Sequence, residues 1–217
     1  MPQGANPPSF FLTVLHIPSN GYGQILLNTI INLIPLLSDA GTDATSAGLD
    51  PGNGYSSVDV HSDYGKFTLD QGRIYIIMSE RLDKTLSLIN ALASAGKEII
   101  CVSRIHPDLL KERYPLHAIK GVWLSERGND NCVSPDQLER VVEVIADFVS
   151  SRRNAAAVLD GIEHISLFTD FRTLNIFLEE LNDVIMASRA ILLIPIDPRL
   201  FDPCQLARLR RYAETLH

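Results

Sequence analysis

The sequence predicts an α/β fold, a three-layer α/β/α sandwich around a mainly parallel β-sheet. Three observations support this prediction. Several apolar runs have the length of a strand, these runs alternate with segments of helical periodicity, and the chain of 217 residues is 46% hydrophobic. Continuously apolar strands are typical of parallel sheets that helices cover on both faces. Right-handed crossovers between successive strands then place the helices in two outer layers.

The first 70 residues differ from the rest of the chain. Ser9–Ile17 is an apolar run of strand length, and Gln24–Leu37 has the pattern of a helix. Asp39–Ser57 is rich in Gly, Asp, Ser and Thr, which indicates a loop or linker. We therefore expect 1–70 to be an N-terminal strand–helix segment with a Gly/Asp-rich loop or linker, and 71–217 to be the α/β domain.

The expected helix Gln24–Leu37 is apolar around most of its circumference. Its polar positions and its proline fall on one narrow stripe: Gln24, Asn28, Asn32 and Pro35. A helix with this pattern must be covered on several sides, by its own domain or by a partner. Its apolar stretch is shorter than the roughly 20 apolar residues of a membrane span, so we expect no span.

Five strands are expected after Gly72, because five short apolar runs follow one another with helical segments between them. These runs are Arg73–Met78, Glu98–Ser103, Ile119–Leu124, Ala155–Leu159 and Ala190–Ile196. Ligands of such sheets bind beyond the carboxyl ends of the strands. The segments expected to contact a ligand are therefore Ser79–Thr85, Ser103–Pro107, Ser125–Asn131, Asp160–His164 and Asp197–Arg199.

The helices between these strands are expected from their caps and apolar faces. Ser79 caps the first, which ends at Gly96, and Asp108–Arg113 forms a short second helix. A later helix with an apolar face is capped by Thr169 or Asp170.

Two further helices are expected to open with a capping box that has proline at the first helical position. Ser134–Gln137 (SPDQ) opens the helix before the fourth strand, and Asp202–Gln205 (DPCQ) opens a terminal helix that continues through Ala213.

Composition excludes several classes of protein. The net charge is −7 and the pI is about 5.3, which argues against a nucleic-acid binder because such proteins carry a basic face. Most of this charge lies in 1–70, which has six acidic residues and one basic residue. Cys101, Cys132 and Cys204 lack the spacing of a disulfide framework or a zinc site, so we expect a reducing cytoplasm. No secretory signal is recognisable.

The chain from about Leu69 to its C-terminus resembles a mainly archaeal family known as domain of unknown function 835. The resemblance rests on GRIYIIMSE, VSRIHPDLLKERY, VWLSE, AAAVLDGIEHISLFTDFRTLNIFLEELNDVI and ILLIPIDPRLF. Most distinctive are a strand followed by Asp160-Gly161-x-Glu163, a helix led by Phe171, and a strand that ends in Asp-Pro. The family has no settled activity, and some members are fused to sensory domains. The resemblance therefore implies a fold and a signalling setting, but no reaction.

Asp160, at the end of an apolar strand, resembles the Walker B aspartate of RecA-like and KaiC-like ATPases. A phosphate loop of the form G-x-x-x-x-G-K-[ST] should accompany it. Met78–Thr85 (MSERLDKT) lies after a strand and keeps Lys84 and Thr85, but it lacks both glycines. Pro18–Ile25 (PSNGYGQI) keeps a glycine but lacks the lysine and the hydroxyl. Neither loop is intact, so we expect a degenerate P-loop on a RecA-like fold.

Simpler alternatives remain open for each of these residues. Asp160 and Glu163 would merely satisfy turn amides, and Lys84 would be a solvated helix residue. Arg104, just past a strand end, would bind an anion or form a salt bridge to Glu80, Asp160 or Asp197. The histidines lack metal-ligand spacing, and Cys101 inside a strand should be a buried hydrophobe.

Three functional hypotheses follow. The first is a non-catalytic regulatory or protein-interaction module with no cofactor, whose apolar N-terminal segment packs on the domain or mediates association with itself or a partner. The second is a nucleotide-binding protein or weak ATPase that uses Mg-ATP with Lys84, Thr85 and Asp160. The third is a sensor of a small anion anchored by Arg104. The candidate ligand-binding residues are Lys84, Thr85, Arg104, Asp160 and Glu163.

Overall fold

The computed structural model describes residues 56–80, 83–113, 119–127 and 132–216. These ranges contain a seven-stranded sheet in the order β6-β5-β4-β7-β8-β3-β9, in which every pair of neighbours is parallel. The strands are β3 (Arg73–Met78), β4 (Glu98–Ser103), β5 (Ile119–Leu124), β6 (Cys132–Val133), β7 (Ala155–Asp160), β8 (Ile191–Ile196) and β9 (Glu214–Leu216). The predicted parallel α/β sheet is confirmed.

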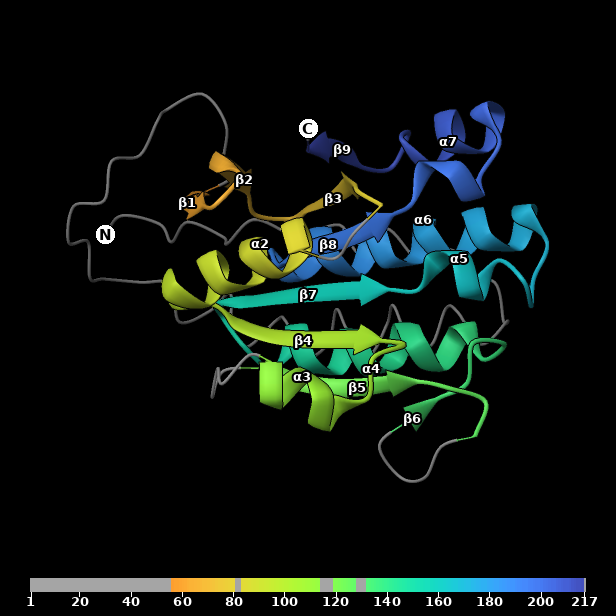
Figure 1. The fold of residues 1–217 in the computed structure, drawn as a ribbon, viewed down its shortest axis with the longest axis horizontal. Coiled ribbons are helices and arrows are strands. Elements are labelled where there is room, and N and C mark those ends of the chain that lie inside the picture. The colour runs from red at the N-terminus through yellow and green to blue at the C-terminus, as the bar shows by residue number, and fades with distance from the viewer. Residues whose placement is uncertain (1–55, 81–82, 114–118, 128–131, 217) are drawn as a thin grey trace, which may run out of the picture.

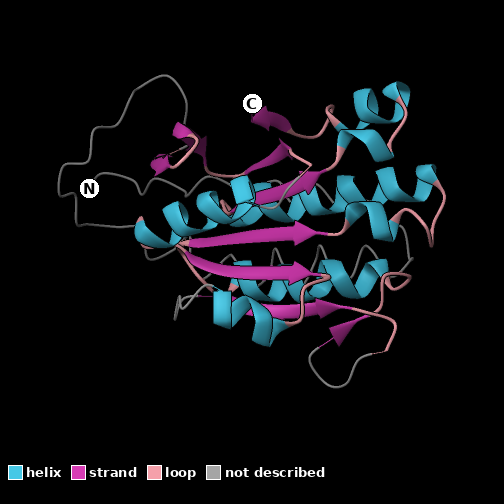
Figure 2. Ribbon diagram, in the orientation of Figure 1, coloured by secondary structure: helices cyan, strands magenta, loops and turns pink. Residues whose placement is uncertain are grey.

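Helices cover both faces of this sheet and complete the three layers (Figures 1 and 2). One face carries α2 (Asp83–Ser94) and α3 (Pro107–Arg113). The other carries α4 (Leu138–Ser150), α5 (Ile162–Ile165), α6 (Phe171–Ser188) and α7 (Pro203–Leu209). A single turn of 3₁₀-helix, η1 (Pro198–Leu200), follows β8.

Strand side chains alternate between two apolar cores, as the two-residue period of a strand requires. On β3, Ile74 and Ile76 are buried in the core beneath α4 and α6. Tyr75 and Ile77 belong to the opposite core, beneath α2. A fully buried side chain of this size contributes about 1.5–3 kcal/mol, so burial on both faces explains why the strands are apolar throughout.

A two-stranded antiparallel hairpin, β1 (Ser57–Ser62) and β2 (Gly65–Asp70), precedes the sheet. Val60 and Leu69 are buried with the residues of α2, and the backbone N–H of Asp63 donates to Ser87 Oγ at 2.9 Å. The hairpin, which was not predicted, therefore packs on the same face of the sheet as α2. The expected strand Ser9–Ile17, the helix Gln24–Leu37 and the loop Pro18–Ile25 lie outside the described residues, so the domain boundary near residue 70 stays a prediction.

Some of the observed helix caps match the caps predicted from the sequence. Asp170 accepts a hydrogen bond from the Thr173 backbone and caps α6, and Asp202 forms the expected capping box of α7 with Gln205. The capping box at Ser134–Gln137 is wrong, because these residues form a turn closed by Gln137 N and Ser134 O, and α4 begins at Leu138.

Two helix boundaries also differ from expectation. Ser79 does not cap the helix after β3, because Glu80 is not helical, and α2 is described from Asp83 onward. The terminal helix ends at Leu209 and does not continue through Ala213, since the chain turns back there and β9 pairs with the open edge of β3.

Candidate functional site

The connections between strands reverse direction between β4 and β7. The chain leaves β4 for β5 on one side, whereas it leaves β7 for β8 on the other side. In open parallel sheets, a crevice for ligands forms at the carboxyl ends of two strands that diverge in this way. The candidate site is therefore at the carboxyl ends of the neighbouring strands β4 and β7 (Figure 1). Ser103 and Asp160 are register partners there.

Asp160 is held by the neighbouring strand. Ser103 Oγ donates to Asp160 Oδ2 at 2.6 Å, and the backbone N–H of Ile105 donates to Ser103 Oγ at 3.0 Å. Burial raises the pKa of the Asp160 carboxyl, while the Ser103 hydrogen bond and the Arg104 charge act in the opposite direction. The carboxyl is thus fixed in place and costly to ionise.

Glu163 links the segment after β7 to the segment after β8. Its Oε1 accepts a hydrogen bond of 2.7 Å from the backbone N–H of Asp197. Burial also raises the pKa of Glu163, and this backbone hydrogen bond opposes the rise. Glu163 therefore satisfies a backbone amide, as the simpler alternative predicted. That amide belongs to Asp197, in the loop after β8.

Gly161 sets the distance between these acids and Arg104. Its φ of 130° lies in a region that side chains rarely adopt, and a Cβ there would be 2.9 Å from Leu124 Cδ2 and 3.2 Å from Arg104 Cγ. Glycine thus lets the turn after Asp160 lie directly against the stem of Arg104.

Arg104 projects into the cleft without an ionic partner among the described residues, where no carboxylate lies within 4.0 Å of it. The expected salt bridge to Glu80, Asp160 or Asp197 is wrong. Arg199 takes two of these partners, because its guanidinium lies 3.1 Å from Glu80 and 2.7 Å from Asp197. The hydrogen bond with Ser103 holds the third carboxyl, that of Asp160.

These groups line one cleft of about 210 Å³ that is open to solvent. The polar side chains of its wall are Ser79, Glu80, Arg104, Asp160, Glu163, His164 and Asp197, and Pro195, Ile196 and Leu200 add apolar surface. Sequence reasoning did not single out Glu80, His164 or Asp197 as ligand-binding residues, although all three fall in the strand-end segments marked for inspection.

Lys84 and Thr85 are not part of this cleft. Lys84 Nζ donates to the backbone oxygen of Leu216 on β9 at 3.4 Å and lies 5.8 Å from the centre of the Phe67 ring. Thr85 is buried, and its hydroxyl has no hydrogen-bond partner. The structure brings Arg104, Asp160 and Glu163 together in the cleft, whereas Lys84 and Thr85 lie on α2 and do not line it.

The remaining features considered in the sequence are Cys101, metal-ligand clusters and membrane-spanning helices. Cys101 is buried inside β4, and burial raises its pKa to about 12, so the expected buried hydrophobe is confirmed. In the described ranges, no three His, Cys, Asp or Glu side chains gather in a way that would hold a metal ion. Across the same ranges, the helices are too short or too polar to cross a bilayer.

A comparison with curated proteins gave no match. One solved structure, a KaiC-like protein from the hyperthermophilic archaeon Pyrococcus horikoshii OT3, is similar with 15% sequence identity and a TM-score of 0.46. The match covers 59% of this chain and 64% of that protein, so it spans less than two thirds of the KaiC-like chain.

The family match covers most of the domain. The family described as "Protein of unknown function (DUF835)" matches residues 78–212, which include the ends of β4, β7 and β8 and every side chain of the cleft wall. On this match, the chain belongs to the DUF835 family.

Proposed function

We propose that the domain is a non-catalytic regulatory module that binds a small anionic molecule in the cleft at the strand ends. The observation that carries this proposal is the Arg104 guanidinium, which lines the cleft while Arg199 holds the nearby carboxylates of Glu80 and Asp197. A guanidinium without an ionic partner presents a planar fork that matches a carboxylate or a phosphate.

The half-buried acids of the cleft, Asp160 and Glu163, are compatible with an anion bound to Arg104. The pKa values of Asp160 and Glu163 are both raised, chiefly by burial, and each carboxyl already accepts a hydrogen bond from the protein. Burial thus disfavours the charged form of both carboxyls, which is the form that would repel an anion bound to Arg104.

Catalysis of nucleotide hydrolysis is not part of the proposal, because the groups that it needs do not converge. Lys84 reaches β9, which β8 and β3 separate from β7, and the hydroxyl of Thr85 is buried. A lysine in a working phosphate loop must reach the terminal phosphates beside the metal-binding acid. The fold is therefore interpreted as a decayed nucleotide-binding fold of RecA-like type.

A regulatory role also requires a surface near the cleft where a protein partner, or a second copy of this chain, can bind differently when the cleft holds a ligand. Leu200 is 65% exposed and lies on the rim of the cleft. Phe168 is 39% exposed and packs edge-on against His164, which lines the cleft, with ring centroids 5.1 Å apart. A partner bound there would be sensitive to the ligand, in keeping with the signalling setting that the family resemblance implies and the cytoplasmic location that the cysteine usage predicts.

The second candidate function is nucleotide binding, and the position of Asp160 at the divergence of β4 and β7 favours it. Thermal melting of the full chain separates the two candidates. Inorganic phosphate, pyrophosphate, citrate and Mg-ATP are the probes, and a ligand at about 100 times its Kd should stabilise the chain by about 2.7 kcal/mol.

Stabilisation by simple anions without magnesium supports the proposed function. Stabilisation by Mg-ATP alone, lost when magnesium is omitted, would replace it with the second candidate. A melting temperature unchanged by every probe contradicts both.

A further inference from the structure

A second hollow, which we call the aromatic pocket, lies beyond the end of β5, at the same end of the sheet as the cleft. It has a volume of about 280 Å³, it is open to solvent, and it shares no residue with the cleft. The segments after β4 and β5, the start of α3 and the start of β6 form its wall, and its lining includes His106, Asp108, Lys111, Trp123, Arg127 and Cys132.

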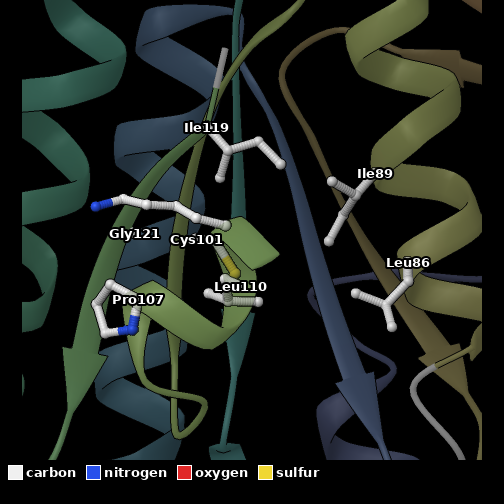
Figure 3. A pocket seen from close by; sticks show the side chains of 8 residues that line it. Leu86, Ile89, Cys101, Pro107, Leu110, Ile119 and Gly121 are labelled. Carbon is white, nitrogen blue, oxygen red and sulfur yellow. The ribbon is translucent and has the colours of Figure 1, made fainter. Parts of the chain in front are cut away.

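The packing of α3 explains why Trp123 is only half-buried. Gly121 and Trp123 alternate with side chains of β5 that are buried beneath α4, so both residues are on the face of the sheet that carries α3. The helix begins directly over Gly121, where a Cβ would be 3.1 Å from Pro107 Cβ. Figure 3 shows Leu110 of the same helix with Cys101 of β4 in the apolar contact between α3 and the sheet. Trp123 is two residues beyond Gly121, and its ring therefore stays half-buried in the wall of the pocket.

The ring of Trp123 is held in one orientation. Its Nε1 donates a hydrogen bond of 3.2 Å to the backbone oxygen of Arg104. The ring of His106 packs edge-on against it, with ring centroids 4.9 Å apart, and His106 Nδ1 accepts a hydrogen bond of 3.3 Å from the backbone N–H of Asp108. Because the one polar group of the indole is already bonded, Trp123 offers a ligand apolar aromatic surface. A fixed surface of this kind favours a planar ring as its ligand.

The charges of the pocket favour a ligand that is also an anion. Lys111 Nζ donates to Asp108 Oδ1 at 3.5 Å, so the acid of the wall is paired with a lysine. Arg127 has no carboxylate within 4.0 Å in the part of the chain that the structure describes. A guanidinium in this state can bind a carboxylate through two parallel hydrogen bonds.

We propose that the aromatic pocket binds a small molecule that carries a planar aromatic ring and a carboxylate, with the ring against Trp123 and His106 and the carboxylate on Arg127. The volume is sufficient, because a cavity of about 150 Å³ already admits benzene. The ligand differs from that of the cleft, since a simple anion such as phosphate has no ring to place against Trp123.

Titration of the full chain with benzoate, followed by tryptophan fluorescence, tests the proposal. Trp123 is the single tryptophan of the sequence, so the fluorescence comes from the wall of this pocket. Benzoate should change it in a saturable way. Cyclohexanecarboxylate has the charge without the planar ring, and benzamide has the ring without the charge, so each should bind at least about fivefold more weakly than benzoate.

Arg127→Ala and Arg153→Ala form a matched pair of variants. Each removes an exposed arginine, but Arg153 is outside the pocket. Arg127→Ala should weaken benzoate binding by at least about fivefold, whereas Arg153→Ala should bind benzoate as the wild type does. Thermal melting of the free variants shows that both remain folded.

Four results would overturn the proposal. The first is fluorescence that benzoate leaves unchanged. The second is equal affinity for benzoate and cyclohexanecarboxylate, which would mean that the pocket does not recognise a ring. The third is equal affinity of the Arg127→Ala and Arg153→Ala variants for benzoate. The fourth is loss of benzoate binding in Arg104→Ala, which would place the probe in the cleft and leave the proposed function intact.

Discussion

Ser103 Oγ donates a hydrogen bond of 2.6 Å to Asp160 Oδ2, and the two residues are register partners at the ends of β4 and β7. The bond joins the two strands at the point where their onward connections diverge. It also orients a buried carboxyl whose charged form would otherwise lack a partner on that oxygen. The cleft therefore depends on a serine that no catalytic motif would have identified.

Replacing Ser103 should destabilise the protein in a pH-dependent way. Ser103→Ala removes a hydrogen bond to a buried carboxyl, which we expect to cost about 2 kcal/mol where that carboxyl is ionised. The cost should shrink at low pH, where Asp160 is protonated in both variants. Urea unfolding at about pH 4 and about pH 8 measures the difference.

Ser188→Ala is the matched control, because Ser188 Oγ donates to the uncharged backbone oxygen of Ile185 at 3.3 Å. Its cost should be the same at both pH values. A Ser103→Ala deficit that does not vary with pH would mean that Asp160 is not the ionising partner.

Gly161 and Gly65 allow the close approach to Arg104 to be separated from backbone strain. Both have a φ near 130°, at 130° and 131°, but a Cβ at Gly65 meets nothing within 4 Å. Gly65→Ala should therefore cost only the strain of its backbone, about 1–3 kcal/mol. Gly161→Ala should cost at least about 1 kcal/mol more, because its Cβ would be 2.9 Å from Leu124 Cδ2. Equal losses in thermal melting would show that the packing against Leu124 relaxes freely.

Glu180 on α6 should control part of the pH dependence of stability. Burial, with the charges of Glu139 on α4 and Asp183 on α6, raises its pKa to about 7. A carboxyl with a raised folded-state pKa binds its proton more tightly in the folded state, so unfolding free energy falls as pH rises from the ordinary value of 4.5 toward 7. Glu180→Gln should therefore stabilise the protein by about 1 kcal/mol at about pH 8 and leave it unchanged at about pH 4. Stabilisation of equal size at both pH values would assign the effect to packing.

Much of the sheet could be predicted from the sequence, because its strands are buried on both faces and therefore read as apolar runs. The runs beginning at Arg73, Glu98 and Ile119 match β3, β4 and β5. The hairpin was missed because only Val60 and Leu69 of its strands are buried, which gives no continuous signal. The edge strand β9 was missed because it has three residues and exists through its pairing with β3.

Only the site residues that directly follow a strand in the sequence could be predicted. Asp160 and Arg104 follow strands, and the sequence placed both at the carboxyl end of the sheet. Lys84 lies outside the cleft because its side chain is directed to Leu216 of β9, a three-residue edge strand that local periodicity does not reveal. The absence of an ionic partner for Arg104 among the described residues likewise depends on Arg199. This residue follows β8 and pairs with Glu80 and Asp197, two of the acids that were possible partners of Arg104.

Calorimetric titration of the full chain with the stabilising anion tests the central claim, that Arg104 anchors an anion in the cleft. Arg104→Ala should weaken binding by at least about tenfold, while the melting temperature of the free protein stays within about two degrees of the wild type. Arg127→Ala, which removes an exposed arginine outside the cleft, should bind as the wild type does. Affinity that is unchanged in Arg104→Ala, or lowered equally in both variants, would contradict the assignment of this cleft as the binding site.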